Sequence, residues 1–200
     1  MSSPIDFYFD FSSPYGYLAS EKIDELAAKH GRTVRWKPVL LGVIFKTTGA
    51  APLLNVPLKG DYAKIDIARS ARSMNIPYRL PASFPQATQQ AARAFYALDD
   101  ADPALARRFA HAAYRAIFVD GRDISAADTV LEIAGACGAD TETLAAAIAT
   151  PEIKERLRRE VEEAMAAGVF GSPYMMVDGE PFMGADRLPQ LERWLAEGPF

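Results

Sequence analysis

The sequence predicts an α/β fold in which both ends of the chain share one mixed sheet and a long helical segment is inserted between them. Three observations support this fold. Apolar residues alternate near the N-terminus, a hairpin signal lies near the C-terminus, and residues 61–167 are almost continuously helical and alanine-rich. The 200 residues, 50% of them hydrophobic, suit one domain or one domain with a large insertion.

Charge and cysteine content exclude several classes of function. The chain has 22 basic and 26 acidic residues, a net charge of −4, so we expect no nucleic-acid partner and no membrane partner. One cysteine, Cys137, cannot form an intramolecular disulfide, and with only two histidines we expect no metal site. We see no signal peptide and no apolar run of about 18 residues, so we expect a cytoplasmic protein.

The N-terminal stretch predicts a strand that runs directly into a helix. Apolar residues occupy the odd positions from Ile5 to Phe11. Ser13 follows as a favoured N-cap, and Pro14 suits the first helical position. A hydroxyl there lies beside free backbone N–H groups, and such a place attracts anions. The alternative is that Ser13 only caps the helix.

The next residues predict a βαβ unit followed by a long loop. The helix should run from residue 14 to about 30 and end at Gly31, and residues 33–37 alternate as a second strand, parallel to the first. Residues 38–57 hold three prolines and two glycines, which indicates a loop with one short helix around 42–47. A loop of this length is usually functional or mobile.

Six helices are expected in the alanine-rich segment. Their predicted ranges are 61–75, 85–99, 103–119, a helix ending at 136, a short helix after 140, and 151–167. The start signals are Asp102 with Pro103, the capping box Ser125-x-x-Asp128, Asp140, and Thr150 with Pro151. The repeated alanine faces predict close packing of these helices.

The C-terminal tail predicts a β-hairpin and a last helix. Residues 174–177 and 180–183 flank Asp178-Gly179, a pair suited to a type I′ turn. Pro181 cannot donate to a ladder, so its strand should lie at the sheet edge. Without the insert the order is βαβαββα, the thioredoxin order. The predicted division is a thioredoxin-like domain of residues 1–60 and 151–200 and an inserted helical domain of residues 61–150.

Three motifs in this order resemble a known family. They are Ser13-Pro14-Tyr15-Gly16, where DsbA-like thioredoxin folds carry Cys-Pro-x-Cys, then Phe170-Gly171-Ser172-Pro173, then Gly184-Ala185-Asp186-Arg187-Leu188. Together they resemble the 2-hydroxychromene-2-carboxylate isomerase family, which is related to kappa-class glutathione transferases. The resemblance spans nearly the whole chain. It implies a thioredoxin-like mixed sheet with a large inserted all-helical domain, and a homodimer.

The resemblance also implies a glutathione site. The cofactor-binding residues would be Ser13, Lys59, Ser172, Pro173, Asp186 and Arg187. Ser13 would hold the sulfur as the catalytic residue, the backbone of Ser172 before a cis-Pro173 would pair with the cysteinyl part, and Lys59 would face the glycyl end. Asp186 and Arg187 would grip the γ-glutamyl end, where an Asp suits an amine and an Arg suits a carboxylate. Taken singly, each residue also has an ordinary structural explanation.

The acceptor side resembles the family less closely. Lys46, Asn55 and Phe84 are the candidate substrate residues, with lysine as a cation for a substrate carboxylate. Family members often carry Gly-Asn where this chain has Gly49-Ala50, and some isomerases carry an aromatic hydroxyl where this chain has Phe84. The natural acceptor therefore stays open.

Three functions follow as alternatives. The first is a glutathione-dependent isomerase interconverting 2-hydroxychromene-2-carboxylate and trans-o-hydroxybenzylidenepyruvate, or a related aryl oxoacid, with glutathione regenerated. The second is a glutathione transferase that releases the adduct, and the third is a non-catalytic thioredoxin-like binding protein. A disulfide oxidoreductase is disfavoured because Ser13 and Gly16 provide no redox pair. Ser13 has no plausible base, because His30 is predicted at the far end of the same helix and His111 in the helical insert. We therefore expect the Ser13 hydroxyl to donate a hydrogen bond to a thiolate.

Overall fold

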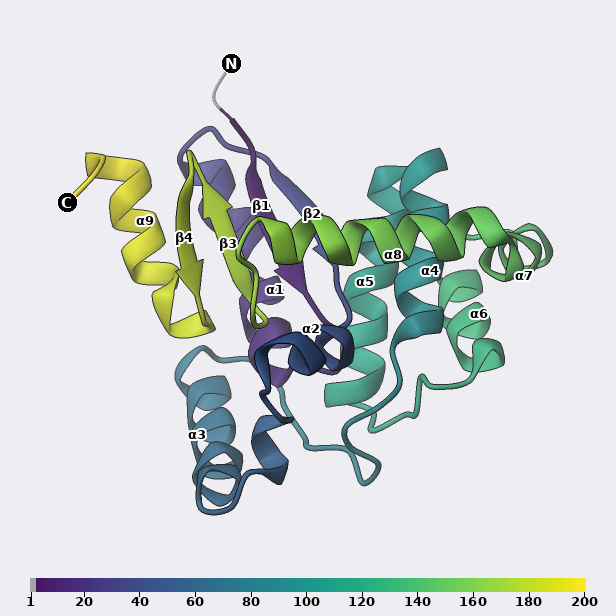
Figure 1. Ribbon diagram of the computed structural model, residues 1–200, viewed down its shortest axis with the longest axis horizontal. Helices are drawn as coiled ribbons and strands as arrows, with labels where there is room; N and C mark the ends of the chain where they lie inside the picture. Colours follow the sequence, from purple (N-terminus) through teal and green to yellow (C-terminus); the bar gives the residue numbers. More distant parts are fainter. Residues whose placement is uncertain (1–2) are drawn as a thin grey trace.

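The computed structural model describes residues 3–200 and confirms the mixed α/β fold (Figure 1). Four strands form one sheet in the order β2-β1-β3-β4. β1 (Ile5–Phe9) pairs in parallel with β2 (Val34–Pro38) and antiparallel with β3 (Tyr174–Val177). β4 (Glu180–Met183) pairs antiparallel with β3 at the edge. The two ends of the chain therefore share one sheet, and the strand with Pro181 lies at its edge, as predicted.

Helices cover the sheet and extend beyond it. They are α1 (Pro14–Lys29), α2 (Leu41–Thr48), α3 (Lys59–Ser73), α4 (Gln89–Ala101), α5 (Pro103–Phe118), α6 (Ala127–Ala136), α7 (Thr141–Ala149), α8 (Pro151–Ala166) and α9 (Leu188–Glu197), with short 3₁₀ helices η1 (Leu53–Asn55) and η2 (Ala185–Arg187). In Figure 1, α4 to α7 form a block beside the sheet, and α9 lies near β4 at the other end. Within residues 3–200, no helix is long and apolar enough to cross a bilayer.

Most predicted helix starts are confirmed, and one capping signal is wrong. The side chains of Asp102, Asp140 and Thr150 cap α5, α7 and α8. The predicted capping box does not form, because α6 follows Ala126 and has no side-chain cap. The Ser125 hydroxyl instead accepts a hydrogen bond from the backbone N–H of Ala87, 3.2 Å away. Ser125 therefore bonds to a residue that is distant in sequence instead of capping α6.

α4 begins at Gln89, later than the predicted start near residue 85. The backbone N–H of Gln86 donates to the Ser12 hydroxyl at 3.0 Å, and its side-chain oxygen accepts from the backbone of Ile124 at 3.0 Å. Residues 84–88 are thus held by the turn before α1 and by the loop before α6. Those contacts compete with helix formation, and local propensity is a weak signal against them.

β1 is buried on both faces. On one face, the ring of Phe9 lies 5.3 Å from Trp36 of β2, 5.8 Å from Phe95 of α4 and 5.7 Å from Tyr114 of α5. The opposite face carries Tyr8 and is covered by α8. There, the Lys37 amine of β2 lies 3.9 Å from the Glu160 carboxylate of α8. These helices remove both sides of the strand from water, so its even-numbered positions are not a solvent-exposed polar face.

Small residues allow the helices to pack closely, as predicted. The buried alanines of α4 and α5 are Ala91, Ala92, Ala94, Ala106, Ala110, Ala113 and Ala116. They belong to the same hydrophobic core as the strands of the sheet. The division of the chain into two domains stays a prediction.

His111 of α5 is a structural residue between the sheet and α1. Its ring packs edge-on against Trp36, with the centroids 4.9 Å apart. Its nitrogens lie 3.7 Å from the Glu21 carboxylate and 3.9 Å from that of Asp24. Burial disfavours the charged ring, but the carboxylates of Asp24 and Glu21 outweigh burial and raise the pKa of His111 to about 9.

We expect the free energy of unfolding to fall as pH rises from about 6.5 to about 9. The folded-state pKa of His111 is about 9 against an ordinary value of 6.5, so its contribution is complete below pH 6.5 and is lost as pH passes 9. Urea unfolding across this window should show a steeper decline for the native protein than for a His111→Gln variant. Parallel pH dependences of the two proteins would contradict this assignment.

Candidate functional site

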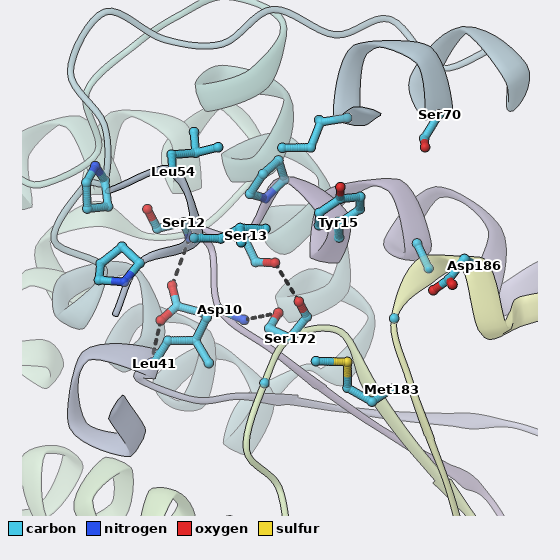
Figure 2. A pocket seen from close by; sticks show the side chains of 18 of the residues that line it. Asp10, Ser12, Ser13, Tyr15, Leu41, Leu54, Ser70, Ser172, Met183 and Asp186 are labelled. Atoms are coloured by element: carbon cyan, nitrogen blue, oxygen red, sulfur yellow. Dashed lines mark hydrogen bonds between the residues drawn. The ribbon is translucent and has the colours of Figure 1, made fainter. Parts of the chain in front are cut away.

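A cleft of about 1620 Å³ lies at the carboxyl end of β1, where α1 begins. Figure 2 shows Ser13 at its centre, with Asp10 and Ser172 close by and Asp186 to one side. The start of α1, α2, α3, residues 84–89 and the segment around Ser172 contribute to its walls. Ligand sites of α/β folds commonly lie outside the carboxyl ends of strands.

Ser13 has the geometry that the sequence predicted. It caps α1, accepting a hydrogen bond from the backbone N–H of Gly16 at 3.0 Å. Its hydroxyl donates to the backbone carbonyl of Ser172 at 2.8 Å, and the Ser172–Pro173 peptide bond is cis. The cis bond that the resemblance implied is therefore confirmed, and it lies beside Ser13.

The structure brings some of the predicted site residues together and leaves others apart. The predicted residues that line the cleft are Ser13, Lys46, Phe84, Ser172 and Asp186. Pro173 is buried directly behind, and its carbonyl accepts a hydrogen bond from Gly184 at 3.0 Å, which ties this segment to the one that carries Asp186. Arg187 lies beside the cleft, 3.6 Å from the Asp186 carboxylate. Asn55 and Lys59 are exposed and are not part of the lining.

Asp10 is a buried carboxylate that sequence reasoning did not single out as a site residue. It lines the cleft with 4% of its surface exposed. Its carboxylate accepts hydrogen bonds from the backbone of Ser12 at 2.8 Å, the backbone of Leu41 at 2.7 Å and the hydroxyl of Thr88 at 3.0 Å. Burial raises the pKa of the Asp10 carboxyl, and these hydrogen bonds partly offset that effect. The sequence signal that could have indicated Asp10 is its position, three residues before the capping Ser13.

Comparison with known proteins identifies the family. A family model described as a DSBA-like thioredoxin domain matches residues 4–196. The chain belongs to the DSBA-like thioredoxin domain family. It is 33% identical to a 2-hydroxychromene-2-carboxylate isomerase of Sphingobium xenophagum over 199 residues, which cover 98% of this chain and 100% of the relative.

Two further comparisons agree with this assignment. Glutathione S-transferase kappa 2 of Caenorhabditis elegans is 29% identical, with 98% of this chain and 92% of that protein covered. The solved structure of a 2-hydroxychromene-2-carboxylate isomerase superposes with a TM-score of 0.87 at 27% identity, covering 96% of this chain and 94% of that structure. The resemblance inferred from the three motifs is confirmed.

The cleft of this member of the DSBA-like family is lined by large apolar side chains and by the basic side chains of Lys22, Lys29, Lys46 and Arg69. Leu41, Leu54 and Phe84, from α2, η1 and residues 84–89, form what we call the apolar wall, whereas Phe170 and Met183 lie on the side of Ser172 (Figure 2). Lys46, in the last turn of α2, is exposed and lines the cleft from the same helix as Leu41. Such a surface suits a flat apolar ligand that carries an anionic group. Within residues 3–200, no group of three or more His, Cys, Asp and Glu side chains is arranged to hold a metal ion.

A polar cluster that the sequence analysis missed joins α1 to α3 at the cleft. The Asp66 carboxylate accepts hydrogen bonds from the Tyr15 hydroxyl at 2.7 Å and from Arg69 at 2.6 Å. These bonds lower the pKa of Asp66. Asp66 and Arg69 form an i, i+3 pair on a helix, which sequence reasoning could treat only as a solvated ion pair. Its partner Tyr15 lies 51 residues away in sequence.

Gly16 is closely surrounded by neighbouring side chains, so that an added side chain would force them to shift. A Cβ at this position would lie 2.6 Å from the Tyr114 hydroxyl and 2.9 Å from the Ser172 hydroxyl. The Tyr114 hydroxyl is fixed because it donates to the Asp10 carbonyl at 3.0 Å. This is the position of the second cysteine in the Cys-Pro-x-Cys motif, so here the side chains around it, as well as the sequence, disfavour a redox pair.

We expect Gly16→Ala to lower the free energy of unfolding by ~1–3 kcal/mol, because an added methyl would overpack a buried, hydrogen-bonded position. Chemical denaturation measures this change. Gly42→Ala is the matched control, since a Cβ there meets nothing within 4 Å. It should be neutral or stabilise by up to ~1 kcal/mol, as expected for Gly to Ala in a helix. Equal destabilisation by both substitutions would contradict the close approach at Gly16.

Proposed function

We propose that this protein is a glutathione-dependent isomerase acting on 2-hydroxychromene-2-carboxylate, trans-o-hydroxybenzylidenepyruvate or a related aryl oxoacid. The observation that carries the proposal is the Ser13 hydroxyl, placed at the N-terminus of α1 and 2.8 Å from the Ser172 carbonyl inside a large cleft. The similarity to 2-hydroxychromene-2-carboxylate isomerases along the whole chain supports the same reading.

The residues around Ser13 fit the chemistry of glutathione. When bound, glutathione would supply a thiolate nucleophile for reversible addition to a conjugated double bond. The Ser172 backbone suits pairing with an extended peptide, Asp186 suits an amine, and Arg187 suits a carboxylate. Lys59 at the glycyl end rests on the resemblance alone, as does Asn55 near the acceptor.

The Ser13 hydroxyl donates its hydrogen to the Ser172 carbonyl. We propose that a peptide N–H of the bound ligand donates to the Ser172 carbonyl in place of the Ser13 hydroxyl. The Ser13 hydroxyl then donates its hydrogen bond to the sulfur. Such a hydrogen bond and the N-terminus of α1 both favour the thiolate over the thiol. Ser13 therefore lowers the pKa of the bound thiol and does not itself attack the substrate.

On the acceptor side, the apolar wall would hold the aromatic ring and Lys46 would face the carboxylate. The anionic, unsaturated aryl oxoacids of the proposal combine these two features. A cation beside a carboxylate orients the substrate and stabilises charge that develops next to it.

A kappa-type glutathione transferase is the second candidate, since a kappa-class relative is 29% identical over almost the whole chain. The same Ser13 site serves both reactions, which differ in whether the adduct is resolved or released. A non-catalytic binding protein remains the third alternative.

We also propose a cytoplasmic homodimer, as the resemblance implies. Three apolar side chains at and on α3 are strongly exposed, namely Leu58 at 87%, Tyr62 at 61% and Ile65 at 62%. Their spacing of four and three residues places them along one side of α3, and grouped exposed apolar side chains are typical of protein interfaces. Analytical ultracentrifugation would report the mass, and a monomer at micromolar concentration would refute this assembly.

Glutathione should raise the melting temperature, because a ligand selective for the native state stabilises it by ~2.7 kcal/mol at 100 times its Kd. The same peptide with serine in place of cysteine is the control and should give a smaller shift. Incubation with an aryl oxoacid should then yield isomer with the free thiol fully recovered. Loss of free thiol in proportion to product would indicate the transferase, and no thermal shift with millimolar glutathione would exclude both enzymes.

Ser13→Ala should lower the rate about 10- to 100-fold, because a charge-assisted hydrogen bond is worth ~1.5–3 kcal/mol. The pKa of bound glutathione should rise, which ultraviolet absorbance of the thiolate against pH would measure. Loss of the N-cap should also lower the free energy of unfolding by ~1 kcal/mol. The neighbouring Ser12→Ala is the control, since its hydroxyl accepts a hydrogen bond from Gln86 and should not affect the thiol. An unchanged thiol pKa with lost activity would assign Ser13 another role.

A further inference from the structure

α2 begins without a cap of its own. Its N-cap residue is Leu40, whose side chain makes no capping hydrogen bond. The first N–H groups of a helix have no intrahelical partner and need an acceptor from elsewhere. For α2 that acceptor is Asp10 at the end of β1, whose carboxylate lies 2.7 Å from the backbone nitrogen of Leu41 (Figure 2). A negative charge at this end of a helix is also favoured by the helix dipole.

The polar atoms of Asp10 make hydrogen bonds on both sides of the cleft. Its backbone N–H donates to the Ser172 hydroxyl at 3.0 Å, and its carbonyl accepts from the backbone of Ser13 at 2.8 Å and from Tyr114 at 3.0 Å. The backbone therefore serves the thiol side. The carboxylate binds the start of α2 and Thr88, on the side of the apolar wall, and also the backbone N–H of Ser12 in the turn before α1. Among residues 3–200, no basic side chain forms an ion pair with it.

α2 has few other anchors. Of its eight residues, all within the described chain, Ile44 is the buried one. Lys46 lies five residues after Leu41, or ~7.5 Å along the helix axis at 1.5 Å per residue. A small tilt at the start of α2 would therefore displace the Lys46 amine relative to Ser13.

We propose that Asp10 is a positioning residue for the acceptor: one oxygen of its carboxylate caps α2 and so holds Lys46 in place, while its backbone and the other oxygen, bonded to Ser12, hold the thiol site. The kinetic part of this inference rests on the proposed function, whereas the capping of α2 can be tested without any ligand. Loss of the carboxylate should therefore affect the acceptor and spare glutathione.

Asp10→Asn tests the cap of α2 because it replaces one carboxylate oxygen by an NH₂ group and keeps the size of the side chain. One carboxylate oxygen accepts from both Ser12 and Thr88, and the other accepts from Leu41. The amide oxygen can keep the first two bonds, which places the NH₂ group against the N–H of Leu41 and breaks the third. Amide hydrogen exchange of residues 41–44 should accelerate about tenfold or more, without ligand. Unchanged protection of the Leu41 amide would overturn the proposal.

The kinetic expectation separates the acceptor from glutathione. In Asp10→Asn, kcat/KM for the oxoacid should fall about tenfold, the size of effect that a lost capping interaction can produce. The Kd of glutathione should stay within about threefold, since the backbone bonds of Asp10 remain. The pKa of the bound thiol should stay constant or fall, because a negative charge has been removed nearby.

A rise in the pKa of the bound thiol, or parallel losses for both ligands, would mean that Asp10 supports the whole site and would overturn the proposal. Failure of the native protein to bind glutathione would instead refute the proposed function and leave the exchange result standing.

A second pair of variants covers the case in which Asp10→Asn does not fold. Leu41→Pro removes the N–H from the other partner at the first helical position, where proline is favoured, and Leu40 is already extended as a residue before proline should be. Leu41→Ala is its reference for loss of the side chain. The proline variant should lose about tenfold more kcat/KM for the oxoacid than the alanine variant, at equal glutathione affinity. Equal kinetics in the two variants would overturn the inference.

Two further variants complete the design. Asp140→Asn is the matched control, because Asp140 caps α7 far from the cleft, and it should leave both ligands unaffected. Lys46→Gln and Asp10→Asn should be less than additive when combined, since both act through one cation. Full additivity of the two losses would contradict action through Lys46.

Discussion

The hydrogen bonds of Asp10 hold together the segments that form the cleft. Burying a carboxylate without a counter-ion is costly, and here three donors from separate segments offset the cost. Its backbone adds bonds to Ser172, Ser13 and Tyr114. Strand, capping turn, cis-proline segment and two helices are thus fixed relative to one residue. Asp10 therefore links the segments on both sides of the cleft.

The double coverage of β1 is what places Asp10 inside the molecule. Aromatic side chains on one face of the strand contact α4 and α5, so the helical segment and the sheet share one core. As a consequence, the helical segment contributes to the site. The Tyr114 hydroxyl reaches the end of β1, and Thr88 and Phe84 lie at the cleft. The helical segment therefore lines the candidate site as well as covering the sheet.

Where DsbA-like thioredoxin folds carry Cys-Pro-x-Cys, this chain has a serine and a glycine, which cannot form a redox pair. Ser13 keeps the capping role at the helix N-terminus but cannot form a disulfide. Gly16 leaves no side chain beside it, and the hydroxyls of Tyr114 and Ser172 lie within 3 Å of where a Cβ would be. Membership of the DSBA-like family fixes the scaffold, whereas these few side chains decide the chemistry that the scaffold can support.

The sequence by itself determined the elements whose signals are local. Strand alternation, the caps Ser13, Asp102, Asp140 and Thr150, and the Asp178-Gly179 turn depend on residues within a few positions of one another. The motifs also predicted that Ser13 and Ser172 meet. Only the tertiary structure decided the role of Asp10, the partner of Ser125, the late start of α4 and the exposure of Asn55 and Lys59. The reason is distance along the chain: Asp10 caps a helix 31 residues away and binds Thr88, 78 residues away. No local pattern records partners that meet only when the core has formed.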